Sequence, residues 1–169
     1  MGQMRQLKLL IGAIAMLCLV SSCNKNHSEE PLREDTIIKT DSQASKIAAL
    51  KEQGYEIFDY VDEQTGDTII MQQYFMAFLK SGPNRDQPQA QADSLQILHR
   101  AHLGRMYELG YADISGPFGD DGDIRGITIY NVPTLKMADS LANSDPMVKA
   151  GRLQIEMHPW WAAKGFNLR

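Results

Sequence analysis

Two histidines lie one helical turn apart in the segment QILHRAHLGRMYELG (residues 96–110), and imidazole is the side chain best suited to acid–base chemistry near neutral pH. At about 100° per residue, one face of a predicted helix carries Leu95, Leu98, His102, Met106 and Leu109. His102 is central on that face, whereas His99 lies at its edge and is expected to reach solvent. Burying an unpartnered imidazole costs about 1–3 kcal/mol, so we expect His102 to meet a polar partner or a wet pocket.

Asp145 is the acid that we expect beside His102. It precedes Pro146 in a short helical turn that stops at Gly151, and this pattern indicates an N-cap. One carboxylate oxygen would remain free to hold an imidazole nitrogen, which fixes the tautomer and leaves the other nitrogen as a general base. The sequence therefore suggests a His102–Asp145 catalytic dyad. The structural alternatives are a satisfied core histidine and a plain helix cap.

The remaining chemical signals are weaker. Arg105, one turn beyond His102, is a minor candidate for binding an anionic substrate, with a surface arginine as the alternative. The turn GDDGD (residues 119–123) lacks the spacing of an EF-hand and is read as a solvated hairpin tip. No metal-ligand spacing, glycine-rich phosphate loop or Gly-x-Ser-x-Gly motif is present, so we expect neither a metal nor a cofactor.

The elements that must position these residues follow from periodicity and turn residues. We expect a helix over 44–53, a hairpin of strands over 55–61 and 67–79, and a helix over 95–109 capped by Asp93 or Ser94. Strands over 111–118 and 123–131, a helix over 135–143 and a last strand over 153–157 complete the pattern. The long loop 81–92 holds two prolines and is a candidate lid or rim.

From residue 69 onward the order is strand, helix, strand, strand, helix, strand, which is the ferredoxin-like α+β plan of a four-stranded antiparallel sheet. Its two helices can cover only one face of the sheet. The strand over 67–79 is apolar on both sides, so the second face also needs a cover. We expect a second copy of the chain there, which would make a homodimeric α/β barrel. The N-terminal helix and hairpin are the alternative cover. Trp160 and Trp161 are expected at a domain or dimer edge.

The N-terminus has the pattern of a bacterial lipoprotein signal. Residues 1–8 carry Arg5 and Lys8, residues 9–20 are apolar, and VSSC ends at Cys23 as in a lipobox. We therefore expect cleavage after residue 22, lipidation of Cys23 and a lipid-anchored place in the bacterial cell envelope, with an ordinary signal peptide as the alternative. The mature chain would hold 15 Lys and Arg against 21 Asp and Glu, a net charge of −6, which argues against nucleic acid.

The predicted organisation is a signal peptide over 1–22 and a lipidated, polar tether over 23–43. A helix and hairpin strand follow over 44–68, then the ferredoxin-like domain over 69–161 and a tail over 162–169. No free thiol is left for catalysis, because Cys18 lies in the discarded segment and Cys23 would carry lipid.

Three motifs in order resemble the YCII-related family of small dimeric α/β-barrel proteins: HRAHLGRMYELG, then ISGPF, then NSDPMVKAGRLQIEMHPW. The resemblance covers about residues 73–160. It implies a ferredoxin-like dimer and an active-site histidine and aspartate, which would correspond to His102 and Asp145. The characterised relatives resemble lyases or isomerases that act on ring compounds. The lipid anchor, the N-terminal helix and hairpin, and the long first loop depart from the family pattern.

Three functions fit these residues. The first is a cofactor-independent lyase or isomerase in which His102 takes a proton beside a carbonyl or phenol. The second is a module that binds a small ligand without chemistry, and the third is a structural dimer. The variant His102→Gln would abolish turnover in the first case, change only ligand affinity in the second and lower only stability in the third.

Overall fold

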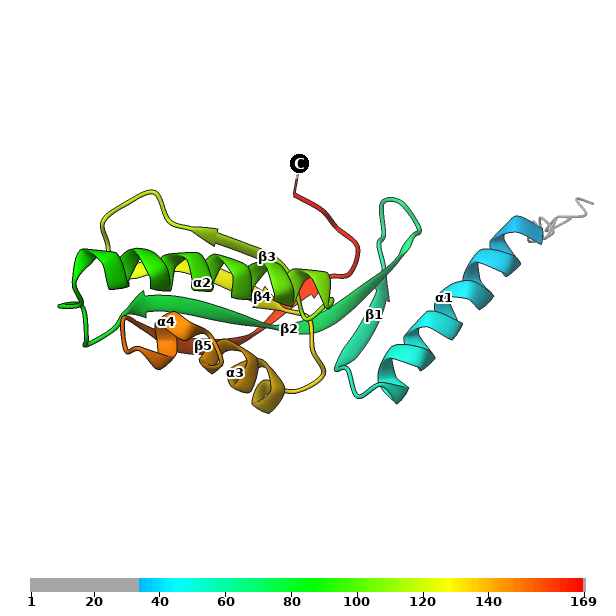
Figure 1. The fold of residues 1–169 in the computed structure, drawn as a ribbon. Helices are drawn as coiled ribbons and strands as arrows, with labels where there is room; N and C mark the ends of the chain where they lie inside the picture. The colour runs from blue at the N-terminus through cyan, green and yellow to red at the C-terminus, as the bar shows by residue number, and fades with distance from the viewer. Residues whose placement is uncertain (1–33, 169) are drawn as a thin grey trace, which may run out of the picture. The chain divides into compact units, whose positions relative to one another are not determined.

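The computed structural model describes residues 34–168, with side chains from residue 42 onward. All described elements belong to one unit over residues 33–169. The signal peptide, Cys23 and the first part of the tether lie outside the described residues. In chain order the elements are α1 (Glu34–Glu52), β1 (Ile57–Val61), β2 (Thr68–Ser81), α2 (Gln89–Glu108), β3 (Ala112–Pro117), β4 (Ile124–Tyr130), α3 (Leu135–Asn143), α4 (Pro146–Lys149) and β5 (Leu153–Ala163) (Figure 1).

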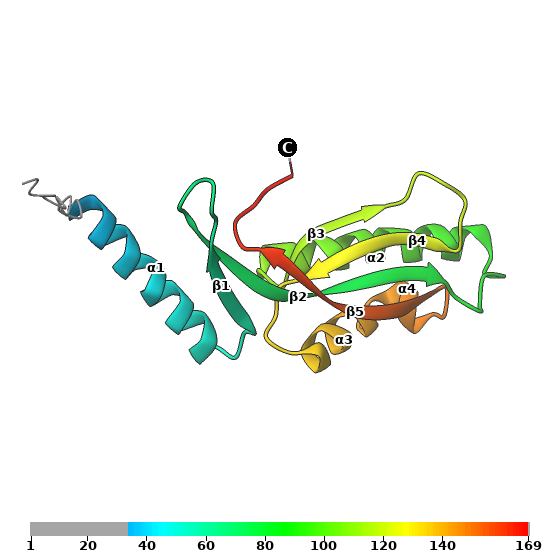
Figure 2. The ribbon, with the colours of Figure 1, turned by 180° about the vertical axis from the view of Figure 1, so that it is seen from behind.

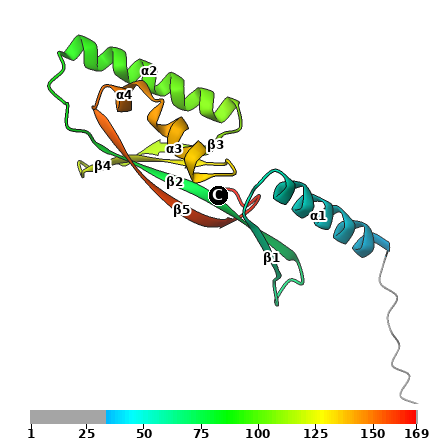
Figure 3. The ribbon, with the colours of Figure 1, turned by 90° about the horizontal axis from the view of Figure 1, so that it is seen from below.

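The sheet confirms the predicted ferredoxin-like plan. Four antiparallel strands lie in the order β3-β4-β2-β5. The first strand of the βαββαβ unit, β2, is therefore central, and the last strand, β5, lies beside it at the edge. The helices α2, α3 and α4 lie on one face of this sheet, as Figures 1 and 2 show from opposite sides. The view from below separates the helical layer from the strands (Figure 3).

The strand β2 is the centre of the fold because its 14 residues pair with three other strands. Its first half forms the predicted hairpin with β1, from Ile57↔Gln72 to Val61↔Thr68. Its second half pairs with β4 on one edge, and β5 runs beside it on the other from Met71↔Ala163 to Ser81↔Leu153. β1 and β4 therefore follow each other along the same edge of β2.

The hydrophobic core lies between the sheet and the helices. The side chains of β2 that point to the helices are Phe75, Ala77 and Leu79, and all three are buried. Across the core they meet buried residues of the other elements: Met106, Ala112, Tyr130, Val132, Ala138, Ala142, Met147 and Leu153. Alternation along β2 sends Tyr74, Met76 and Phe78 to the opposite face, where Met76 and Phe78 are only half-buried.

Three elements extend beyond the ranges that periodicity predicts. The helix α1 begins at Glu34 rather than residue 44, so the last ten residues of the predicted tether are helical. The helix α2 begins at Gln89, with Pro88 as its N-cap, and this corrects the predicted cap at Asp93 or Ser94. The strand β5 continues to Ala163. Each added stretch is polar or has irregularly spaced apolar residues. The hydrophobic periodicity of the sequence therefore covers only part of each element.

Among the described residues, no helix is long and apolar enough to cross a membrane.

Candidate functional site

A buried histidine–aspartate pair links α2 to the N-terminus of α4. The Nδ1 atom of His99 lies 2.6 Å from Oδ2 of Asp145, and the two residues are 9% and 3% exposed. The other carboxylate oxygen, Oδ1, accepts the backbone N–H of Met147 at 2.8 Å, so the predicted N-cap is present. Because a carboxylate faces Nδ1, the neutral ring carries its proton on Nδ1 and leaves Nε2 as an acceptor.

The structure therefore corrects the expected pair, since His99 and not His102 contacts Asp145. The prediction and the structure differ in how α2 is rotated about its own axis. The buried residues of this helix are Ala92, His99 and Met106, which repeat every seventh position, whereas Leu98 and Leu109 are about half exposed. Apolar residues occur on several sides of α2, so periodicity alone left its rotation open.

His102 lies on the flank of the buried face of α2, where it is half-buried. Its Nε2 is the only fully buried side-chain nitrogen or oxygen without a partner among the described residues. Burial lowers the pKa of His102, and the Asp145 carboxylate opposes this effect. The positive charges of His99, Lys149 and Arg105 lower it further. A catalytic role for His102 remains a prediction that no observation tests.

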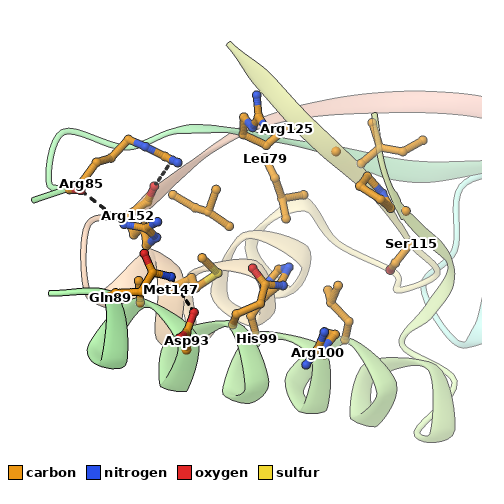
Figure 4. Close-up of a pocket in the computed structure, with 18 residues that line it drawn as sticks. Leu79, Arg85, Gln89, Asp93, His99, Arg100, Ser115, Arg125, Met147 and Arg152 are labelled. Atoms are coloured by element: carbon orange, nitrogen blue, oxygen red, sulfur yellow. Dashed lines mark hydrogen bonds between the residues drawn. The ribbon is translucent and has the colours of Figure 1, made fainter. Parts of the chain in front are cut away.

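The free nitrogen of His99 faces a cavity of about 640 Å³ between α2 and one end of the sheet. In the described part of the chain Nε2 has no hydrogen-bond partner, and it is not among the fully buried unpartnered atoms, so solvent reaches it. Figure 4 shows the ring projecting from α2 into this space, with Met147 and Leu79 beside it. The volume suits a small organic molecule.

The loop predicted over 81–92 is shorter in the structure, because β2 ends at Ser81 and α2 begins at Gln89. Its residues 82–88 form one end of this cavity, and backbone contacts hold them in place. Gly82 N–H donates to the carbonyl of Arg152 at 3.0 Å, and Asn84 N–H donates to that of Gly151 at 2.9 Å. A Cβ on Gly82 would lie 2.2 Å from the Gly151 oxygen, so only glycine allows this crossing. The loop is thus a fixed rim in this structure.

Arginines from four places line the cavity: Arg85 from the loop, Arg100 from α2, Arg125 from β4 and Arg152 before β5. Arg85 and Arg152 lie together at the loop end, and Arg125 lies apart from them, on β4 (Figure 4). Arg105, the arginine that the sequence suggested for an anionic substrate, is exposed and does not line the cavity.

The other predicted features lie outside the cavity. The hairpin tip at Asp120–Gly122 is exposed, with Asp120 accepting the N–H of Gly122. His158 is exposed on the sheet face opposite the helices, where its Nε2 lies 2.9 Å from Glu156. No group of three or more His, Cys, Asp and Glu side chains among the described residues is arranged to hold a metal ion.

Sequence reasoning missed His99 and the four cavity arginines. His99 could have been found by weighing both rotations of α2 against Asp145, because His99 and His102 are one turn apart. The arginines come from four separate elements, and no local spacing relates them. Only the tertiary fold brings their side chains to one cavity.

No family model matches the chain, and no curated protein matches it. Solved structures of similar fold include the following two. Muconolactone isomerase is 17% identical, with a TM-score of 0.42, over 52% of this chain and 86% of that one. The 5-chloro-2-hydroxyhydroquinone dehydrochlorinase of Burkholderia phenoliruptrix AC1100, solved with 2,5-dihydroxybenzoquinone, is 23% identical, with a TM-score of 0.39, over 52% and 92%.

Proposed function

We propose that the protein is a cofactor-independent enzyme of the lyase or isomerase kind, with His99 as the general base and Asp145 as the group that orients it. The observation that carries the proposal is the contact of 2.6 Å between His99 Nδ1 and a buried carboxylate, with Nε2 open to the cavity. We also retain the YCII-related assignment of residues 69–161, on the ordered motifs of the sequence.

In this mechanism Nε2 of His99 takes a proton from a carbon next to a carbonyl group of the substrate. The electron pair left on carbon moves into the carbonyl as an enolate, and the ring becomes an imidazolium. The Asp145 carboxylate stabilises this cation and remains ionised. Return of the proton to a different carbon completes an isomerisation. Departure of a leaving group from the adjacent carbon completes an elimination.

The test is turnover by variants of the purified protein. Small carbonyl compounds and hydroxylated rings are screened by mass spectrometry for any conversion. With the substrate found, His99→Gln should lower kcat/KM by about 10²–10⁴-fold, the usual contribution of a positioned general base. His158→Gln removes an exposed histidine on the opposite face of the sheet and should leave turnover unchanged. Unchanged turnover in His99→Gln would refute the proposal.

We propose further that the mature protein is a lipoprotein of the bacterial cell envelope, anchored through Cys23. The support is the sequence alone: basic residues, an apolar run and VSSC ahead of residue 24. Growth with an alkyne fatty acid should label the wild-type chain and not Cys23→Ser. Equal labelling of both chains would refute lipidation at Cys23.

We propose also that two copies pair through the sheet face opposite the helices. That face presents the half-buried side chains of Met76 and Phe78 from β2 and Ile127 from β4, which alternation along the two strands puts on the same side as the buried Ile129. Apolar surface of this kind is stabilised by being removed from water. A second identical sheet supplies a matching apolar surface and a symmetric interface.

A further inference from the structure

The cavity in front of His99 is positively charged within a chain whose formal net charge is −4. Its lining contains four arginines and one carboxylate, Asp93. The Asp93 side chain accepts a hydrogen bond from the amide of Gln89 at 2.8 Å. The nearby Asp123 lies 3.7 Å from Lys80 rather than beside a cavity arginine. Positive charge in a water-filled recess attracts anions.

None of the four guanidinium groups forms an ion pair with a carboxylate in the described part of the chain. Three of them are oriented by neutral oxygen atoms instead. Arg85 Nη1 donates to the carbonyl of Arg152 at 3.2 Å, and Arg152 Nη1 donates to Gln87 Oε1 at 2.9 Å. Arg125 Nη1 donates to the carbonyl of Gly122 at 3.0 Å. Each guanidinium has five donors, so most of them remain available.

Two of these cations are held near each other by the backbone. The Gly82–Gly151 crossing fixes the loop against the start of β5, and this places Arg85 beside Arg152. Each of these two residues also donates to the carbonyl of the other, Arg152 at 3.4 Å. Two like charges repel, and an anion bound between them would make the net electrostatic energy of the three groups favourable. The planar fork of arginine matches a carboxylate through two parallel hydrogen bonds.

We propose that the cavity binds a small organic acid with two carboxylates, one held by Arg85 and Arg152 and the other by Arg125. Arg100, next to His99 in the sequence, adds positive charge at the same cavity. This proposal names the substrate class of the proposed function, and it depends on that function only for the chemistry at His99. Binding of the dicarboxylate does not depend on that chemistry. A substrate carbon that lies between the two carboxylates and next to a carbonyl group would be the one that gives its proton to Nε2 of His99.

The test is calorimetric titration of the full-length protein with straight-chain dicarboxylates of increasing length, their monomethyl and dimethyl esters, and inorganic phosphate. We expect one chain length to bind best, its monoester to bind roughly tenfold more weakly and its diester not to bind. Arg85→Gln and Arg125→Gln should each weaken binding roughly tenfold, because each removes a charge-assisted contact. Arg105→Gln is the matched control, since this exposed arginine lies outside the cavity, and should bind as the wild type does.

The titrations separate this proposal from the proposed enzymatic function. If no dicarboxylate binds the wild type, if phosphate binds in their place, or if the Arg85 and Arg125 variants bind equally well, the substrate class is wrong. His99→Gln should still bind the dicarboxylate while turning nothing over. The enzymatic function would instead be overturned if dicarboxylates that also carry a carbonyl group beside a C–H bond bound the wild type and none was converted, which would leave an anion-binding protein.

Discussion

The buried carboxylate of Asp145 contacts the ring of His99 and not that of His102. Both of its oxygen atoms are used, one by the ring of His99 and one by the N–H of Met147. The ring of His99 therefore has a fixed orientation, and its remaining nitrogen faces the cavity. His102 lies one turn further along α2 with an unpartnered Nε2.

The pH dependence of stability should report on His102. Burial lowers its pKa below the ordinary value of 6.5, and the charges of His99, Lys149 and Arg105 act in the same direction against Asp145. Just below pH 6.5 the unfolded chain thus binds more protons than the folded one, so the free energy of unfolding falls as the pH falls. In urea unfolding, His102→Gln should flatten this decline, and His158→Gln should not. An equally steep decline in His102→Gln would contradict this explanation.

The residue types of the site could be predicted, but their pairing could not. A histidine on α2 and the capping Asp145 were both visible in the sequence. Choosing between His99 and His102 needed the rotation of α2, and the exposed Leu98 and Leu109 show why apolar spacing misled that choice. Tertiary contacts, including the one to Asp145, determine which face of such a helix is buried.

The crossing of the loop after β2 with the turn before β5 positions two of the cavity arginines, Arg85 and Arg152. Gly82→Ala would place a Cβ 2.2 Å from the Gly151 oxygen and force the two segments apart. We expect a loss of about 1–3 kcal/mol in the free energy of unfolding and weaker anion binding.

Gly104→Ala is the control for this substitution. Gly104 lies within α2, and a Cβ there would meet nothing within 4 Å. The change should raise the free energy of unfolding by about 0.5–1 kcal/mol, because alanine has less backbone freedom to lose in a helix. Urea denaturation measures both variants. Equal effects of the two substitutions would show that the crossing is not tight.

The predicted elements agree best with the structure where capping and periodicity act together. The helix α3 covers the predicted residues 135–143, and its cap Thr134 accepts the N–H of Met137. The start of α2 was missed because its first turns, Gln89–Asp93, carry no apolar spacing and follow a proline. The end of β5 was missed because its last residues gain their partners from β2, at Tyr74↔Trp160 and beyond.

At the scale of the whole molecule, the ferredoxin-like plan was predictable because the order of elements admits few arrangements. On the sheet face opposite the helices, Met76, Phe78 and Ile127 remain only half-buried in the single chain. If two copies pair through this face, Ile127→Lys on β4 should turn the dimer into a monomer, because it would bury an unpaired charge at the interface.

Ile97→Lys is the matched control for the dimer, since Ile97 is 60% exposed on α2. It should leave the assembly intact. Sedimentation equilibrium of the purified protein measures the mass of both variants and of the wild type. A monomeric wild type, or a dimer that persists in Ile127→Lys, would contradict pairing through the sheet.

The proposed chemistry requires that Asp145 hold the His99 ring with its proton on Nδ1 and its Nε2 free in the cavity. The most direct test is a two-bond ¹H–¹⁵N correlation spectrum of the imidazole rings, recorded at alkaline pH and assigned with His99→Gln. We expect the Nδ1–H tautomer for His99 in the wild type and its loss in Asp145→Asn, where an amide can donate to Nδ1. A wild-type ring protonated on Nε2 and bare on Nδ1 would contradict it.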